Sequence, residues 1–263
     1  MSENRIHPTA VISPDTFIGS DISIGPYAVI DRGVTLGSGC VIGPHAVIEG
    51  NTTIGENVKI FQFASVGAAP QDIHYSGAPT RLEIGDNTVI RESVTIHRGT
   101  EDGGGLTSVG SNCMIMAYCH IAHDCRVADN VIMANAATLG GHVEIGKHAV
   151  VGGLSAIHQF CRIGEYAFIG GMSGTNKDIP PFVKYQGTRS NLFGLNLIGL
   201  RRQGFSKEAI KTLRDCYRLV FHQSITITEG LETAAERYPD SEEVRTFVEF
   251  IRSSKRGVPS ARS

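Results

Sequence analysis

An aliphatic residue returns at every sixth position through the first quarter of the chain. The series runs without a miss over Ile6, Ile12, Ile18, Ile24, Ile30, Leu36, Ile42, Ile48, Ile54, Ile60 and Val66. Six residues of an α-helix rotate the chain by about 600°, so a helix cannot keep every sixth residue on one face. A single strand of this length is implausible. The pattern therefore predicts a coil of short strands with a turn in each hexad.

The hexad register survives two interruptions. Residues 68–82 lack the pattern, yet it resumes on the same count at Ile84. Residues 99–108 contain three consecutive glycines, and after them the phase shifts by one. A new series then runs in steps of six from Val109 to Ile169. We predict two loops that project from a continuing coil.

The position two residues before each aliphatic should face inward at a corner, where space is small. Five of the six cysteines share this position: Cys40, Cys113, Cys119, Cys125 and Cys161. The chain also has no Cys-x-x-Cys pair. These cysteines are therefore predicted to be small apolar fillers rather than disulfide partners or zinc ligands.

The hexads fail after Gly171, and the segment Asp178–Pro181 marks a boundary. We predict a β-helix over residues 1–186 and a small α-helical domain over 187–263. The expected helices are 192–203 capped by Asn191, 207–222 capped by Ser206, a short helix starting at Thr228, and 241–254 with a capping box of Asp240 and Glu243.

Composition narrows the class of protein. The 263 residues carry a net charge of −2, so no global field attracts nucleic acid or anionic lipid. The N-terminus has no secretory signal, and no 18-residue apolar run predicts an integral membrane segment. A cytoplasmic protein is the expectation. Twelve of the 24 Lys and Arg residues lie in the last quarter, which predicts either a solvated helical surface or a dock for an acidic partner.

The segment Cys119–Cys125 concentrates the candidate chemistry. His120, His123 and Asp124 fall within five residues. Imidazole suits proton removal near neutral pH, and a neighbouring carboxylate can fix its tautomer. Adjacent strand residues point to opposite faces, so contact between His123 and Asp124 requires a turn, which the hexad phase provides. A surface pair without function is the competing interpretation.

Several motifs in series resemble the UDP-N-acetylglucosamine acyltransferases, a family of hexapeptide-repeat acyltransferases. The matching segments are Gln62–Gly67, Arg91–Thr100, His120–Cys125, His158–Cys161 and Gly204–Ser206. The resemblance implies a mainly β protein, a left-handed parallel β-helix with three hexads per turn and a small C-terminal α-helical domain. It also implies a homotrimer without metal or cofactor. Its activity would be transfer of a 3-hydroxyacyl chain from acyl carrier protein to the 3-position of UDP-N-acetylglucosamine, the first step of lipid A synthesis.

The same resemblance implies roles for individual residues. His123 would be the general base, Asp124 would orient it, and the Gly141 N–H would stabilise the oxyanion. Gly141 lies 18 residues after His123, one coil along. Gly171 matches the position that limits acyl length. The implied substrate-binding residues are Asp72, His74, His97, His120, His142, His158, Gln159, Asn196 and Arg202.

Two departures from the family pattern leave the acceptor open. His74 stands where well-known members carry Lys, and Ile198 stands where many carry Glu. Both changes fall at the implied sugar-nucleotide site. The acceptor is therefore either a 3-hydroxyl sugar, giving an ester, or a 3-amino sugar, giving an amide.

Three other functions compete. A γ-type carbonic anhydrase shares the coil but needs three imidazoles on zinc and no long helical domain. An N-acyltransferase of a later step in the pathway carries an extra N-terminal domain, for which hexads beginning at Ile6 leave no room. A non-catalytic scaffold explains the repeats but not the histidine cluster.

Overall fold

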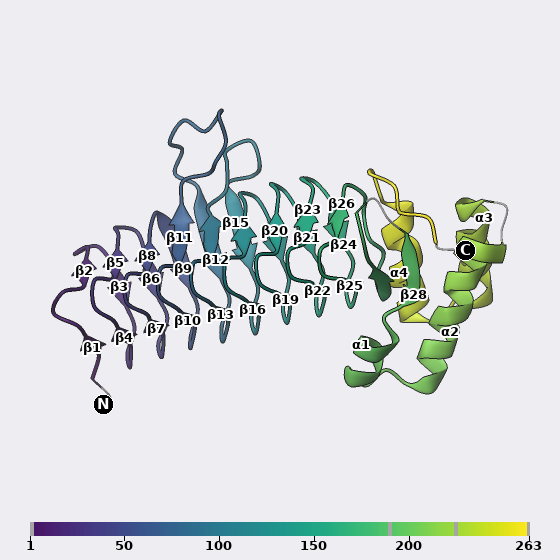
Figure 1. Cartoon of the computed structure of the whole chain (residues 1–263), viewed down its shortest axis with the longest axis horizontal. Helices are drawn as coiled ribbons and strands as arrows, with labels where there is room; N and C mark the ends of the chain where they lie inside the picture. Colours follow the sequence, from purple (N-terminus) through teal and green to yellow (C-terminus); the bar gives the residue numbers. More distant parts are fainter. Residues whose placement is uncertain (1–2, 189–190, 224–225, 262–263) are drawn as a thin grey trace.

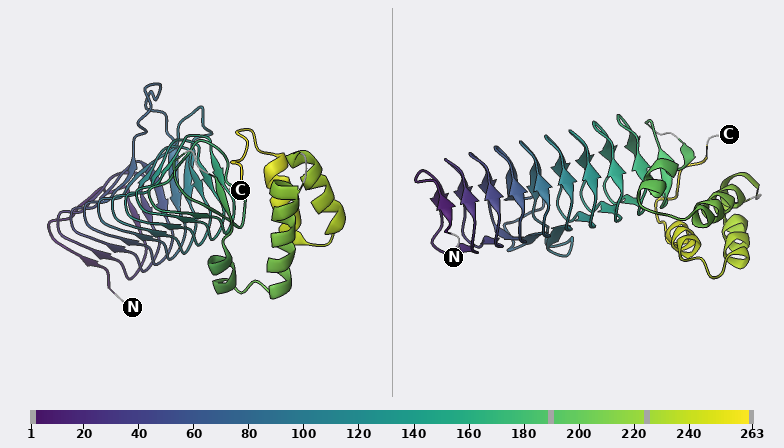
Figure 2. Two further views of the ribbon diagram at one scale, coloured as in Figure 1. Left: turned by 45° about the vertical axis from the view of Figure 1, so that its right-hand side comes forward. Right: turned by 90° about the horizontal axis from the view of Figure 1, so that it is seen from below.

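The computed structural model describes residues 3–188, 191–223 and 226–261. It is a left-handed parallel β-helix with a helical cap at its C-terminal end (Figure 1). From β1 to β23, each strand pairs in parallel with the strand three places further along the chain, so three short strands complete one coil. The predicted coil of hexads is confirmed, and its three sides form a prism (Figure 2).

Three sheets form the sides of the prism. Sheet A contains β1 (Arg5–Ile6), β4 (Ser23–Ile24), β7 (Val41–Ile42), β10 (Lys59–Ile60), β13 (Val89–Ile90), β16 (Met114–Ile115), β19 (Ile132–Met133), β22 (Val150–Val151), β25 (Phe168–Ile169), β27 (Val183–Tyr185) and β28 (Leu192–Leu195). Sheet B contains β2 (Val11–Ile12), β5 (Val29–Ile30), β8 (Val47–Ile48), β11 (Ser65–Ala68), β14 (Thr95–His97), β17 (His120–Ile121), β20 (Thr138–Leu139), β23 (Ala156–Ile157) and β26 (Gly174–Thr175). Sheet C contains β3 (Phe17–Ile18), β6 (Thr35–Leu36), β9 (Asn51–Ile54), β12 (Arg81–Ile84), β15 (Leu106–Val109), β18 (Arg126–Val127), β21 (Glu144–Ile145) and β24 (Arg162–Ile163).

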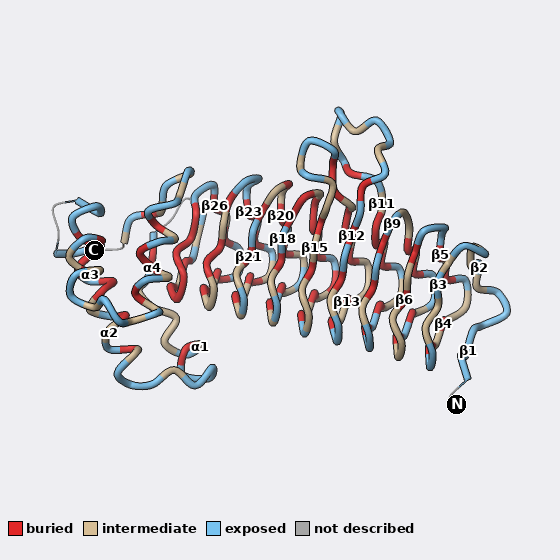
Figure 3. The backbone as a smooth tube through the Cα atoms, turned by 180° about the vertical axis from the view of Figure 1, so that it is seen from behind, coloured by how far each residue is buried: buried red, intermediate tan, exposed pale blue. Residues whose placement is uncertain are grey.

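The hexad aliphatics fill the inside of the prism, and Figure 3 shows buried positions recurring in successive coils. Ile84 pairs in register with Ile54 on one side and Val109 on the other, although loops separate all three in sequence. The register therefore continues across both interruptions, as predicted. All six cysteines are buried and free, so within the described chain they are small fillers.

The outward positions differ between the sheets. From β13 to β25, sheet A presents an apolar row: Val89, Met114, Ile132, Val150 and Phe168. From β12 to β24, sheet C presents a polar row: Glu83, Ser108, Arg126, Glu144 and Arg162. Burial of apolar surface lowers the free energy, whereas burial of charged surface raises it. Sheet A is therefore suited to a protein interface and sheet C to water.

Most turns of the coil have a left-handed backbone three residues after the inward aliphatic. This position has φ near +60° and forms a column along each corner of the prism. We name the columns by the sheets they join. The A/B column includes Tyr27, Phe63, Tyr118, Leu154 and Met172; the B/C column includes Asp124, His142 and Phe160; the C/A column includes Asn57, Asn87, Asn112, Asn130, His148, Tyr166 and Phe182.

Two loops leave the coil at the B/C corner. One connects β11 to β12 over residues 69–80, and the other connects β14 to β15 over residues 98–105. Both connections run from a sheet B strand to a sheet C strand, and both loops project from the same side of the prism (Figures 1 and 2).

The helices are α1 (Leu197–Arg202), α2 (Lys207–Arg218), the π-helix η1 (Leu219–Gln223), α3 (Ile227–Arg237) and α4 (Glu242–Arg252). Ser206 caps α2 as predicted, because its side chain accepts a hydrogen bond from the Ala209 N–H. The predicted extension of that helix to residue 222 is wrong only in type, since the last turn is π-helical. In the described residues, no helix is long and apolar enough to cross a membrane.

Three predicted helix starts are wrong. Residues 192–195 form β28, which pairs antiparallel with β27 and covers the open edge of the last coil. The helix begins after Asn196, whose side chain accepts from the Gly199 N–H. Thr226 caps α3 in a capping box with Glu229, in place of a start at Thr228. Ser241, rather than Asp240, caps α4. The last coiled strand ends at Tyr185, and the division into domains at residues 186 and 187 stays a prediction.

Candidate active site

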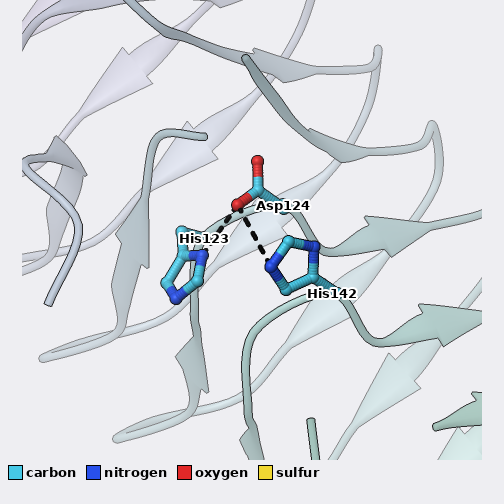
Figure 4. Close-up of side chains that lie close together, drawn as sticks. All are labelled: His123, Asp124 and His142. Carbon is cyan, nitrogen blue, oxygen red and sulfur yellow. Dashed lines mark hydrogen bonds and ion pairs between the residues drawn. The ribbon is translucent and has the colours of Figure 1, made fainter. Parts of the chain in front are cut away.

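His123 and Asp124 meet at the B/C corner. The His123 Nδ1 atom lies 2.7 Å from Asp124 Oδ2, and His142 Nε2 lies 3.7 Å from the same oxygen (Figure 4). Contact between neighbours in sequence is possible because Asp124 has φ +60° and its side chain turns back across the corner. The Asp124 side chain is 1% exposed and that of His123 is 15% exposed. A buried carboxylate therefore holds an imidazole whose outer edge reaches solvent.

Gly141 lies directly under the His123 ring. A Cβ atom at this position would stand 2.6 Å from His123 Cε1 and 2.8 Å from Nε2, closer than real Cβ atoms approach. Glycine is thus required here by space. The Gly141 N–H has no acceptor among the described residues, which leaves it available to a bound group.

The loop over residues 98–105 encloses the Asp124 carboxylate. The Thr100 N–H donates to Asp124 Oδ1 at 2.9 Å, and Thr100 Oγ1 lies 2.6 Å from Oδ2. The Asp124 N–H donates to Thr107 Oγ1 at 2.7 Å. These bonds were not foreseen from the sequence. Thr100 itself, the last residue of a segment that resembles the family, and the glycine run at residues 103–105 were the available signals.

Two further histidines lie beside His123 and Asp124, which we call the dyad. His120 stands in β17 with its Nδ1 2.7 Å from Thr95 Oγ1, and its ring meets that of His97 edge-on with centroids 4.9 Å apart. Burial, with smaller contributions from His120, His123 and Arg98, lowers the pKa of His97 to about 4. Burial and the charge of His123 also lower the pKa of His120. Both rings are therefore held neutral at neutral pH.

His142 connects the dyad to an aromatic wall and to the long loop. Its ring stacks on Phe160 with centroids 4.4 Å apart and 12° between the planes. Burial lowers its pKa, while Asp124 and Asp72 oppose that shift. The loop over residues 69–80 leaves the coil at the same B/C corner, and in that loop the His74 N–H donates to Asp72 Oδ1 at 2.9 Å.

His158 and Gln159 lie one coil beyond Gly141. The Phe160 N–H donates to the Gly141 carbonyl at 3.0 Å, which aligns the two turns. His158 is exposed, and its Nδ1 lies 3.3 Å from Nη2 of Arg256, a residue of the C-terminal tail. The sequence alone gave no sign of this contact between the tail and the coil.

Three predicted site residues do not lie at the B/C corner. Asn196 donates from Nδ2 to the carbonyl of Tyr166, which belongs to the C/A column, and Arg202 ends the helix that Asn196 caps. Gly171 precedes Met172 in the A/B column. Within one chain the structure therefore does not bring Asn196, Arg202 or Gly171 to the dyad.

Among the described residues, one group of three side chains is compact enough to share a metal ion: His123, Asp124 and His142, with ligand atoms within 4.8 Å of one another. The group contains two imidazoles and a carboxylate, whereas the zinc alternative needs three imidazoles. His120, the third imidazole of that alternative, instead faces Thr95 and His97.

A three-sided coil of hexads with a histidine–carboxylate pair on one corner defines a transferase of the hexapeptide-repeat class. A family model described as bacterial transferase hexapeptide matches residues 15–50 and 107–141, and one described as UDP N-acetylglucosamine O-acyltransferase, domain 2, matches residues 178–259. An acyl-[acyl-carrier-protein]–UDP-N-acetylglucosamine O-acyltransferase from Myxococcus xanthus is 51% identical over 97% of this chain and 98% of its own. The chain belongs to the UDP-N-acetylglucosamine O-acyltransferase family.

Other relatives agree with this placement. The Halorhodospira halophila protein of the same name is 47% identical over 97% of this chain and 98% of its own. The solved structure of a UDP-N-acetylglucosamine acyltransferase from Campylobacter jejuni is 41% identical and superimposes with a TM-score of 0.93, covering 98% of this chain and all of that one. The likeness therefore includes both the coil and the helical cap.

Proposed function

We propose that this protein transfers a 3-hydroxyacyl chain from acyl carrier protein to the 3-hydroxyl of UDP-N-acetylglucosamine, the first step of lipid A synthesis. The observation that carries the proposal is the geometry of His123. Its Nδ1 is held by a buried carboxylate, and its ring lies over Gly141, whose N–H is available. Family membership supplies the substrates, and a cytoplasmic location belongs to the same proposal.

The reaction follows from these positions. His123 Nε2 removes the proton from the sugar hydroxyl, and the oxygen attacks the thioester carbonyl carbon. The Gly141 N–H donates to the oxyanion of the tetrahedral intermediate. When the intermediate collapses, the carbon–sulfur bond breaks and His123 returns the proton to the thiolate. Asp124 stabilises the imidazolium between the two transfers. No step requires a metal or a cofactor.

The remaining site residues are assigned to binding. Asp72 and His74 lie on the long loop that leaves the coil at the B/C corner and are assigned to the sugar, together with His97, His120 and His142. His158 and Gln159 follow along the corner and are assigned to the acyl arm. Asn196 and Arg202 are assigned to the nucleotide, with the Arg202 guanidinium on phosphate. Gly171 leaves room for a long acyl chain.

A homotrimer is supported by the surface of the prism. Exposed bulky apolar side chains follow the A/B column, from Tyr27 at 57% exposed to Met172 at 73% exposed. The apolar outward row of sheet A adjoins this corner. Exposed apolar surface of this extent marks an interface. We place the A/B corner of each prism at a three-fold axis, with charged sheet C facing outward.

The same arrangement completes the active site. When the A/B corners meet at the axis, sheet B of one prism faces sheet A of the next. The outer edges of that contact are the B/C corner of the first chain and the C/A corner of the second. His123 of one copy is thereby brought towards Asn196 and Arg202 of its neighbour. This explains why one chain separates residues that the reaction needs together.

The donor protein has a candidate dock on the helical cap. A groove over α1 and α2 is lined by four basic residues, Arg201, Lys207, Lys211 and Arg214, together with Phe205 and Ile210. Acyl carrier protein is acidic, and a basic groove steers an acidic partner. Since α1 lies at the C/A corner, the dock opens beside the proposed composite site.

The decisive experiment is acyl transfer by the purified protein with 3-hydroxymyristoyl acyl carrier protein as donor. UDP-N-acetylglucosamine and its 3-amino analogue are run side by side. We expect turnover of the hydroxyl sugar, with His74 a tolerated replacement for Lys. Turnover of the amino sugar alone would change the product to an amide. If a folded trimer turned over neither, the transferase assignment would be abandoned, and hydration of CO₂ by the zinc-loaded protein would be tested.

A further inference from the structure

We propose that Thr100 is a positioning residue of this enzyme, which fixes the Asp124 carboxylate so that only one tautomer of His123 is productive. The proposal rests on the proposed function, because it concerns the base of that reaction. Thr100 belongs to the loop over residues 98–105 and is 6% exposed. Its hydroxyl bonds to Asp124, and the effect on His123 passes through that carboxylate.

The direction of the hydrogen bonds at Thr100 is determined. The Gly103 N–H can only donate, and it points to Thr100 Oγ1 at 3.1 Å. A hydroxyl has one proton, and a carboxylate can only accept. The Thr100 proton therefore lies on the 2.6 Å bond to Asp124 Oδ2. The backbone N–H of the same residue donates to Oδ1 at 2.9 Å.

Both oxygens of Asp124 are thus held by one residue, and the orientation of the carboxylate is fixed. Oδ2 still accepts a second bond at 2.7 Å from His123 Nδ1. A carboxylate only accepts hydrogen bonds, so Asp124 cannot donate a proton to the ring. His123 must therefore carry its proton on Nδ1, and this leaves Nε2 free to accept a proton from a substrate hydroxyl.

Two glycines make this clamp possible. A Cβ at Gly103 would overlap the Asp124 carboxylate group, and a Cβ at Gly99 would stand 2.9 Å from Asp124 Oδ1. Neither glycine has a positive φ, so space rather than backbone conformation requires them. The glycines let the loop close directly on the carboxylate and exclude water from it.

The test compares Thr100→Val, Thr100→Ser and a matched control, Thr88→Val. Thr88 is also buried, donates from Oγ1 to the Gly110 carbonyl at 2.7 Å and accepts from the Cys113 N–H at 3.1 Å. It has the same kind of hydrogen bonds away from the dyad. We expect Thr100→Val to lower kcat by about 10- to 100-fold, the effect of losing one hydrogen bond to a charged group, with KM changed less than about three-fold.

Two readouts separate positioning from stability. Thr100→Ser keeps the hydroxyl and should recover most of the lost kcat, while Thr88→Val should keep the wild-type kcat. Nitrogen-15 NMR of the imidazole rings should show the His123 proton on Nδ1 in the wild type and shared between both nitrogens in Thr100→Val. Thermal unfolding measures folding for all three variants.

The outcomes decide between separate claims. Wild-type kcat and tautomer in Thr100→Val overturn the proposal. An equal loss in Thr100→Ser also overturns it, because packing of the methyl group would then be the cause. If the wild-type protein transferred no acyl chain, the proposed function would fail instead, and the tautomer measurement would still decide the role of Thr100.

Discussion

The A/B and B/C columns occupy the same position of the hexad and share a left-handed backbone, yet Asp124 of the B/C column is unlike any residue of the A/B column. Leu154 and Met172 have φ of 57° and 56°, and Asp124 and His142 have φ of 60° and 61°. Yet the first pair is exposed and apolar, whereas Asp124 is buried and hydrogen-bonded on all sides. The turn geometry alone therefore does not make a site.

The difference comes from the two loops. Both loops leave the coil at the B/C corner, one in each of the two coils that precede the coil carrying Asp124. The loop over residues 98–105 supplies Thr100 to the carboxylate. The A/B corner has no insertion, so its side chains stay uncovered. Where a left-handed turn carries no functional side chain, the residue is one that tolerates the conformation. The C/A column shows this, because it repeats Asn.

The largest effect should come from removing the base. His123→Ala should lower kcat by about 10² to 10⁴-fold, the usual contribution of general base catalysis. The melting temperature should hardly change, because the His123 ring lies on the outside of the prism over Gly141. Steady-state kinetics and thermal unfolding check both parts. A large loss of stability with intact chemistry would make His123 a structural residue.

The next largest effect should come from a charge placed at the apolar A/B corner. Leu154→Asp would place a charge at the proposed three-fold axis, at a cost on the order of 3–5 kcal/mol per copy for an unpaired buried charge. We expect the trimer to dissociate and turnover to fall with it. Sedimentation velocity measures the oligomeric state.

Phe17→Asp is the matched control for that variant. Phe17 stands on sheet C and is 65% exposed, against 66% for Leu154. Because sheet C faces outward in the proposed trimer, Phe17→Asp should stay trimeric and active. Dissociation by Phe17→Asp, with a trimer retained in Leu154→Asp, would move the interface to sheet C.

Much of this fold could be predicted because the hexad period is strict. Counting in sixes places the inward residues, and counting in eighteens places Gly141 beside His123. Periodicity fails where the chain leaves the repeat. Residues 192–195 were expected in a helix, and the open sheet edge beside Val183 makes them a strand. The sequence pattern of residues 192–195 contains no information about this edge, because the edge exists only once the coil has formed.

The site was predictable in its residues but not in its assembly. His123 and Asp124 are neighbours in sequence, so their pairing needed only a turn. The contact of Thr100 with Asp124 joins residues 24 apart across a loop of irregular structure, which no period describes. The separation of Asn196 from the dyad depends on which corner each occupies, and that follows from the three sheets together.

The buried side chain of His97 should make the free energy of unfolding depend on pH. His97 has a pKa of about 4 when folded, against 6.5 in the absence of burial. Since the unfolded chain binds the proton more readily, the free energy of unfolding should fall as pH drops from about 6.5 to 4, by on the order of 3 kcal/mol. His120 and His142, whose pKa values are also lowered, act in the same direction.

Chemical denaturation of the wild type and of His97→Leu at several pH values isolates this contribution. The variant should lose less stability between pH 6.5 and 4 than the wild type, because one proton-linked group is gone. Identical slopes in the two proteins would show that His97 titrates alike when folded and unfolded.

The smallest effect is the sharpest test of the composite site. Chains with His123→Ala and chains with Arg202→Ala should each be inactive alone. When the two are co-expressed in equal amounts, three-quarters of randomly assembled trimers are mixed, and each mixed trimer has one site of three that combines an intact His123 with a neighbour's intact Arg202. Activity should return to about a quarter of wild type.

Co-expression of His123→Ala with Asp124→Asn is the matched control, since both changes lie on one corner and every site of every trimer carries one of them. Recovery in the first mixture alone requires two chains per site; no recovery in either would place Arg202 and His123 in one chain's site, against the arrangement of the corners.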